Sequence, residues 1–104
     1  MTVAEQIGLN LRKVRRRANM SQDALSKRTG LHHTEISMLQ CGGRIPRLDT
    51  AIKIIGSTQA GPGELVDGIT WHEPPRWDER GWFTIVGLDE PVDVRQPRSG
   101  GEGV

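Results

Sequence analysis

The stretch GLHHTEISML, residues 30–39, contains the side chains of this chain that are best suited to chemistry. His32, His33, Glu35 and the nearby Cys41 are all metal ligands by type, so a zinc site is one interpretation. The same side chains, carried on a short helix, could instead hydrogen-bond to base edges in the major groove of DNA. The two interpretations predict different proteins, and the surrounding sequence has to decide between them.

The spacing of these residues argues against a metal centre. A structural zinc site takes about four well-spaced ligands, whereas His32 and His33 are adjacent and would point about 100° apart on a helix. Cys41 has no evident base or orienting partner, which favours a buried or half-buried thiol. The sequence also shows no Ser-His-Asp arrangement, glycine-rich phosphate loop or pair of catalytic carboxylates. We therefore expect no metal, no cofactor and no enzyme activity.

Charge divides the chain into two halves of opposite sign. Residues 1–55 contain ten Lys and Arg and four Asp and Glu, a balance of +6, whereas residues 56–104 contain four and nine, a balance of −5. A basic half of this kind indicates a polyanion partner. The 104 residues suit one domain with a small appendage, and the single cysteine excludes an intrachain disulfide. With no apolar run of membrane-spanning length, we expect a cytoplasmic, nucleoid-associated protein.

The spacing of apolar residues predicts a helix over residues 3–18. Steps of three and four residues place one apolar face on this segment, made of Val3, Ile7, Leu11, Val14 and Ala18. Ser21 is suited to cap a second helix over residues 22–29, and Gly30 is suited to end it in a left-handed conformation.

Three further helices are expected after Gly30. A third, over residues 33–40, should turn Ile36 and Leu39 inward, with Leu31 before it filling the core. A fifth, over residues 62–66, would begin at a proline, which the first turn tolerates. The fourth is indicated by the apolar face formed by Leu48, Ala51, Ile52 and Ile55.

The composition changes after Gly68, where all three tryptophans and the only phenylalanine occur. We predict two strands, over residues 69–72 and 82–86, because β-branched and aromatic residues cluster there. An isolated two-stranded ribbon is marginal in water, so it should pack on the helices or on another chain. We divide the protein into residues 1–68, a helical domain, residues 69–88, the ribbon, and residues 89–104, a flexible tail. The candidate contacts with a partner or second copy are Trp71, Trp77, Trp82 and Phe83.

Six residues or residue pairs of this chain occur at the spacing that is usual in one known family. They are Ser21-Gln22, Leu25-Ser26, Gly30-Leu31, Ile36-Ser37, Gly42 and Pro46. This outline resembles the phage-repressor and Cro-type (Xre-like) helix-turn-helix family over roughly residues 5–67. The resemblance implies a mainly α protein, with a five-helix lambda-repressor-like domain followed by the short ribbon. The family usually places a glutamate where Gln40 stands, paired with an arginine of the first helix, here Arg15.

The resemblance makes the third helix the one that reads DNA. Its outward side chains are the candidates for contacts with bases, namely His33, Thr34, Glu35, Ser37 and Met38. Gln22 and Arg44 match the phosphate-contacting positions of the family. The further phosphate candidates are Arg12, Arg15, Arg16, His32, Gly43 and Arg47.

These observations lead to two hypotheses on function. The first is a sequence-specific transcriptional regulator, expected to repress, that binds an inverted-repeat operator in double-stranded DNA as a homodimer. The alternative is an antitoxin- or adaptor-type interaction module, whose acidic, tryptophan-bearing C-terminal part binds a protein such as a toxin or another regulator. Neither hypothesis involves a membrane.

Overall fold

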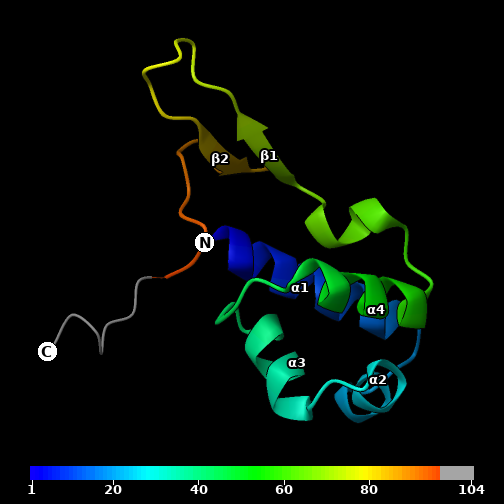
Figure 1. Cartoon of the computed structure of the whole chain (residues 1–104). Coiled ribbons are helices and arrows are strands. Elements are labelled where there is room, and N and C mark those ends of the chain that lie inside the picture. Colours follow the sequence, from blue (N-terminus) through cyan, green and yellow to red (C-terminus); the bar gives the residue numbers. More distant parts are fainter. Residues whose placement is uncertain (97–104) are drawn as a thin grey trace, which may run out of the picture.

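The computed structural model describes residues 1–96, and helices make up about half of them. Figure 1 shows the helices grouped in one body, with α2 and α3 at one end and the ribbon projecting from the other. The elements in chain order are α1 (Val3–Arg17), α2 (Gln22–Thr29), α3 (His33–Gln40), α4 (Leu48–Thr58), the 3-10 helix η1 (Pro62–Val66), β1 (Ile69–His72) and β2 (Trp82–Ile85).

The long first helix has the inner face that its sequence predicts. It begins with a capping box, in which the Glu5 amide donates to Thr2 Oγ1 at 3.1 Å and the Thr2 amide donates to Glu5 Oε1 at 2.8 Å. α1 ends at Arg17, with Ala18 as its C-cap. Four of the five residues of the predicted face are buried, namely Val3, Ile7, Leu11 and Val14, and Ala4 is buried as well.

The turn between α2 and α3 also follows the sequence. Ser21 caps α2, because its Oγ accepts a hydrogen bond from the Ala24 amide at 3.0 Å. Gly30 ends the helix with φ = 75°, in the left-handed region that glycine adopts without strain. The Ser26 hydroxyl then donates to the Leu31 carbonyl at 2.5 Å. The main core gathers residues from all five helices and from the loop between α4 and η1: Leu11, Val14, Leu25, Ile36, Leu39, Ile54, Ala60 and Leu65.

The inner face of α4 differs from the one that we expected. Ile54, together with Thr50 and Thr58, is buried, whereas Leu48 is 78% exposed and Ile52 is 59% exposed. Ala51 and Ile55, the other two members of the predicted face, are only partly buried against the core. Apolar residues occur on more than one side of this helix, and the Thr58 hydroxyl can turn inward because it donates to the Ile54 carbonyl at 2.8 Å.

The fifth helix has the predicted bounds, Pro62–Val66, and is a 3-10 helix. A buried asparagine of α1 holds the end of this segment, since the Asn10 side-chain amide donates to the carbonyls of Leu65, at 3.0 Å, and Asp67, at 2.9 Å. At its start, the Gly61 amide donates to Glu64 Oε2 at 2.5 Å. The same carboxylate forms an ion pair with Arg17 at the end of α1, with Nη2 donating to Oε2 at 2.9 Å.

The ribbon is an antiparallel pair that aligns Ile69 with Ile85 and His72 with Trp82. β2 is one residue shorter than predicted, since it ends at Ile85. Trp71 meets Phe83 edge to face, with ring centroids 5.0 Å apart, and His72 stacks on Trp82 at 5.3 Å. Ile85 is buried, which places the helical end of the ribbon against the body of the protein.

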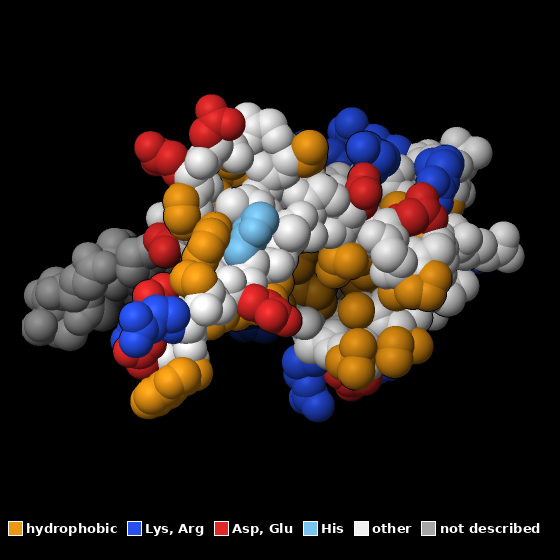
Figure 2. Space-filling view, turned by 90° about the horizontal axis from the view of Figure 1, so that it is seen from above, with side chains coloured by type: hydrophobic (Ala, Val, Ile, Leu, Met, Phe, Trp, Pro, Cys, Tyr) orange, Lys and Arg blue, Asp and Glu red, His pale blue; other side chains and the backbone are white. Residues whose placement is uncertain are grey.

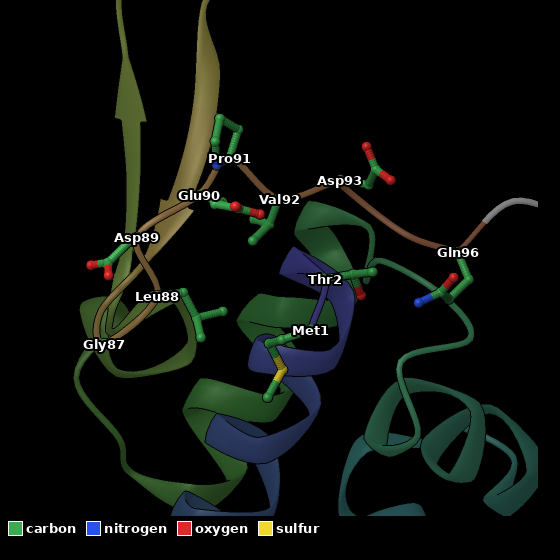
Figure 3. A pocket seen from close by; sticks show the side chains of 10 residues that line it. All are labelled: Met1, Thr2, Gly87, Leu88, Asp89, Glu90, Pro91, Val92, Asp93 and Gln96. Atoms are coloured by element: carbon green, nitrogen blue, oxygen red, sulfur yellow. The ribbon is translucent and has the colours of Figure 1, made fainter.

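The segment after the ribbon, which we expected to belong to a flexible tail, contacts both the ribbon and α1. The amides of Val3 and Ala4 donate to the carbonyls of Asp93 and Val94 at 2.9 and 2.8 Å, and the Val92 amide donates to the Phe83 carbonyl at 3.0 Å. Figure 3 shows residues 87–96 curving around Met1 and Thr2 to line a shallow pocket. The carbonyls of this segment therefore accept bonds from the first turn of α1, whose amides have no partner within the helix. The rest of the tail, residues 97–104, lies outside the described residues.

The described helices include none with the length and apolar character that a membrane span requires.

The ion pair between Arg17 and Glu64 gives the fold a defined acid sensitivity. The hydrogen bond from Arg17, followed by the one from the Gly61 amide, lowers the pKa of Glu64 from 4.5 to about 2. A carboxylate with a lowered folded-state pKa stabilises the fold above its unfolded-state pKa, and that contribution is lost as the pH falls through the folded-state value.

We therefore expect Glu64→Gln to lower the thermal midpoint at pH 7, and the difference from the native chain to shrink below pH 4.5 and close near pH 2. Thermal unfolding followed by circular dichroism from pH 7 to pH 2 measures this difference. Glu73→Gln, which changes an exposed carboxylate of the ribbon loop, serves as the control and should leave the midpoint unchanged. A Glu64→Gln difference that stays constant over the whole range would contradict the assignment.

Candidate nucleic-acid interface

The outward side of α3 carries three exposed polar residues, His33, Thr34 and Ser37. Ile36 and Leu39 on the other side are buried in the core, which fixes the rotation of the helix about its axis. His33 and Thr34 lie in the first turn of α3, the part of a recognition helix that reaches base edges. Ile36 and Leu39 therefore point inward as predicted, whereas two of the five residues predicted to point outward, Glu35 and Met38, are half-buried.

His32 caps α3, because its Nδ1 accepts a hydrogen bond from the Thr34 amide at 3.1 Å. An accepting Nδ1 implies that the proton of the neutral ring is on Nε2. The rings of His32 and His33 stack with centroids 4.3 Å apart. Our expectation that the two rings point 100° apart was wrong, because His32 has an extended backbone and precedes the helix.

A hydrogen bond between the two helices of the motif sets the position of Gln22. The Ser37 hydroxyl donates to Gln22 Oε1 at 3.1 Å, which leaves the amide nitrogen of Gln22 available as a donor. Ser37, a candidate for contact with bases, thus orients Gln22, a candidate for contact with phosphate. Both residues come from the predicted set, and the structure brings them together.

Two other predicted residues, Glu35 and Arg44, form an ion pair across the end of α3. Arg44 Nη1 lies 2.5 Å from Glu35 Oε2, and both side chains remain partly exposed. The ion pair occupies both side chains, so it has to break before Glu35 or Arg44 contacts DNA.

Gly43 lies next to Met38, whose Cε would be only 2.8 Å from a Cβ at position 43.

Arg15 turns toward the protein and holds the end of α3. Its Nε donates to Gln40 Oε1 at 2.8 Å, and its Nη1 donates to the Met20 carbonyl at 2.7 Å. The geometry confirms the predicted pairing with Gln40. Burial, and then the charges of Arg16 and Arg12, lower the pKa of Arg15 from its ordinary value. The three arginines therefore repel one another, and an approaching polyanion would relieve that repulsion.

The remaining predicted arginines are exposed. Arg12 lies on α1 one helical turn after Gly8, and its side chain is exposed. Arg16 follows Arg12 after a further turn, and the two line a hollow of about 430 Å³ on α1. Arg47, before α4, lies 3.4 Å from Asp49, with its side chain 85% exposed.

A metal centre has no support in the described part of the chain, where no three His, Cys, Asp or Glu residues gather. Cys41 is exposed, contrary to our expectation of a buried or half-buried thiol. It is the C-cap residue of α3, and its thiol donates to the Met38 carbonyl at 3.4 Å.

One residue that positions the site was missed by the sequence analysis. A Cβ at Gly8 would lie 2.4 Å from the Gln40 carbonyl oxygen and 2.7 Å from that of Leu39. α1 and the end of α3 can approach this closely only because residue 8 has no side chain. The available signal was a glycine inside an otherwise regular helix, which weakens the helix unless packing requires it.

The geometry and the comparisons define the class of this protein. The model of a family described as helix-turn-helix (HTH_3) matches residues 11–65, more than half of the chain. The chain therefore belongs to the Xre/Cro-like helix-turn-helix family of DNA-binding transcription regulators.

Among solved structures, the chain is similar to the restriction-modification controller protein C.AhdI from Aeromonas hydrophila, with 26% sequence identity and a TM-score of 0.57. The match covers 60% of this chain and 94% of the controller protein. A search of curated proteins found no match.

The close contact between Gly8 and the end of α3 leads to a prediction about how α3 packs on α1. We expect Gly8→Ala to destabilise the fold by about 1–3 kcal/mol, because the new methyl group has to displace backbone. Gly56→Ala is the matched control, since Gly56 also lies within a helix but has open space around its Cβ position.

The control should stabilise the fold by roughly 0.5–1 kcal/mol through helix propensity. Urea unfolding of the two variants and the native chain measures both effects. Equal effects of the two substitutions would show that the approach of α1 to α3 does not depend on Gly8.

Proposed function

We propose that this protein is a sequence-specific transcription regulator that inserts α3 into the major groove of its operator. The observation that carries this proposal is the arrangement of α3, whose polar first turn is exposed while its apolar side and both ends are held by the protein. An α-helix fits the major groove, where each base pair presents a different pattern of donors, acceptors and methyl groups.

The base-reading role is assigned to the outward residues of α3. His33 can hydrogen-bond to guanine N7, and Thr34 can hydrogen-bond or contact a thymine methyl group. Ser37 and Met38 lie further along the helix, where Met38 suits a thymine methyl group. Glu35 can accept from a cytosine amino group once it separates from Arg44.

The phosphate-binding role is assigned to the residues around α3. Gln22, held by Ser37, has a free amide donor at the start of α2, and His32 carries its ring proton on the nitrogen that is not used in the cap. Arg15 is the weakest candidate, since Gln40 and Met20 already accept its hydrogen bonds. The other candidates are Arg12, Arg16, Gly43, Arg44 and Arg47.

Two copies of the protein are required for this function, because one recognition helix contacts too few bases for high specificity. A homodimer on an inverted repeat presents two α3 helices about one turn of DNA apart. Bound in this way the protein would repress by occluding the operator, with no catalytic step. The similarity to a restriction-modification controller protein supports a regulatory role.

A second candidate function rests on the ribbon. Trp77 at its loop is 94% exposed and Trp71 is 53% exposed. Exposed tryptophans are enriched at protein interfaces, and the ribbon lies at the end of the molecule away from α3 (Figure 1). It could therefore bind a protein partner, as an antitoxin or adaptor does, together with the less exposed Trp82 and Phe83.

Point variants distinguish readers of bases from ligands of phosphate. We expect His33→Ala and Thr34→Ala each to lower discrimination between the preferred duplex and a scrambled one by about 1–3 kcal/mol. Gln22→Ala and Arg16→Ala should weaken binding to both duplexes alike, and Arg16→Ala, which removes a positive charge, should also reduce the slope of log K against log salt by about 0.9.

Fluorescence anisotropy over a series of salt concentrations measures these quantities. Trp77→Ala is the control and should leave DNA binding unchanged, while it should reduce any binding to a protein partner. If His33→Ala and Thr34→Ala both retain full discrimination, α3 is not the reading element.

A further inference from the structure

Glu35 is the only acidic residue of α3, the helix that we assign to the major groove. Figure 2 shows acidic side chains gathered over the ribbon and the segment after it, which Figure 1 places at the other end of the molecule from α3. A carboxylate in the first turn of a helix suits the helix dipole, but beside DNA it repels the phosphates. Glu35 therefore stabilises α3 and opposes its approach to DNA unless another charge balances it.

Arg44 balances the charge of Glu35 in the free protein. All four acidic residues among residues 1–55 lie at most 3.9 Å from a positive group. Three of these pairs join residues no more than four positions apart, which are neighbours through local geometry alone. The pair of Glu35 and Arg44 spans nine positions and joins the first turn of α3 to the loop after it, with Nη1 2.5 Å from Oε2. The fold, and not proximity in the sequence, makes this pair.

The Arg44 side chain is free to change partners while its backbone stays in place. The loop before it is fixed, because Gly42 is buried with φ = 80° and the Gly43 amide donates to the Met38 carbonyl at 2.9 Å. The Arg44 side chain is 55% exposed and that of Glu35 is 28% exposed. An ion pair between exposed side chains is weak, since water competes for both charges. The pair can therefore open at small cost.

We propose that this ion pair couples the reading of one base pair to one phosphate contact. The inference rests on the proposed function, because it requires α3 in the major groove. Where a cytosine amino group meets Glu35, the carboxylate accepts its hydrogen bond, and Arg44 is released to a neighbouring phosphate. Where the base presents a carbonyl oxygen instead, the two acceptors repel each other. Glu35 then stays with Arg44, and the phosphate loses its ligand.

The coupling makes Arg44 a specificity-determining residue although it contacts no base. A positive side chain that contacts only phosphate strengthens binding to all sequences alike. Arg44 instead strengthens binding only to duplexes that satisfy Glu35. One base pair thus controls two contacts, the hydrogen bond to Glu35 and the phosphate bond of Arg44.

Fluorescence anisotropy with the full chain and two duplexes tests the inference. The first is the duplex preferred in a selection from random DNA. The second replaces the cytosine at which Glu35→Gln loses sequence preference by thymine, whose O4 accepts where the cytosine amino group donates. We expect Arg44→Ala to lower the affinity for the first duplex about tenfold and to leave the affinity for the second nearly unchanged.

The variant Glu35→Gln completes the cycle, because it frees Arg44 from its charged partner. In this background Arg44→Ala should weaken binding to both duplexes by the same factor. The slope of log K against log salt gives an independent readout. For the native chain it should be smaller on the thymine duplex by about 0.9 for each half-site, and for Glu35→Gln it should be the same on both duplexes.

Two variants serve as matched controls. Arg16→Ala removes another candidate ligand of phosphate and should weaken binding to both duplexes alike. Asp49→Asn removes the same charge as Glu35→Gln from a second exposed ion pair, the one with Arg47. It should leave both the preference for cytosine and the difference in slope in place. Circular dichroism of each variant should show the helix content of the native chain.

Several outcomes would overturn the inference. If Arg44→Ala weakens binding to both duplexes by the same factor, Arg44 is an ordinary phosphate ligand. If Glu35→Gln weakens binding to both duplexes alike, Glu35 holds Arg44 in a fixed position and couples nothing. If Glu35→Gln keeps the native preference at every position, Glu35 reads no base. In each of these cases a native chain that still discriminates between duplexes keeps the proposed function, whereas a native chain without any preference rejects both.

Discussion

The approach of α1 to the end of α3 is the contact on which the rest of the site depends. The carbonyl groups of Leu39 and Gln40 lie so near Gly8 that no side chain fits between them. The guanidinium group of Arg15 then bonds to the side chain of Gln40 and to the Met20 carbonyl, which joins α3 to both α1 and the turn before α2. This packing of α3 against α1 determines how far the opposite side of α3 projects from the protein.

The other end of α3 is held by polar contacts that also bear on function. The His32 ring closes the first turn, and the bond from Ser37 to Gln22 joins the helix to α2. The residues that we propose as base readers are therefore carried by a helix fixed at both ends, whereas Arg44 lies on a glycine-containing loop and is paired with Glu35. Such a division suits recognition, because base contacts demand fixed positions while phosphate contacts tolerate adjustment.

The sequence predicted those parts of the fold where a residue type favours one local structure. Ser21 and Gly30 mark helix ends because few residue types suit an N-cap or a left-handed backbone. The apolar residues of α1 recur every three or four positions and so define a single apolar face. α4 was predicted less well, since isoleucines at 52, 54 and 55 fit two faces and the choice depends on where the core lies. The stacking of His32 on His33 depends on the extended backbone of one residue, and the bonds of residues 92–94 are made between distant segments. Local patterns carry neither kind of information.

Selection of bound sites from random duplex DNA tests most directly the central claim that a pair of α3 helices reads an operator. The account predicts enrichment of an inverted repeat whose half-site centres are ~34–36 Å apart, one turn of the double helix. It also predicts that a selection with the Thr34→Ala variant loses sequence preference at the same position of each half-site. Enrichment of no sequence, or of the same sequence by both proteins, would contradict the claim that α3 reads bases.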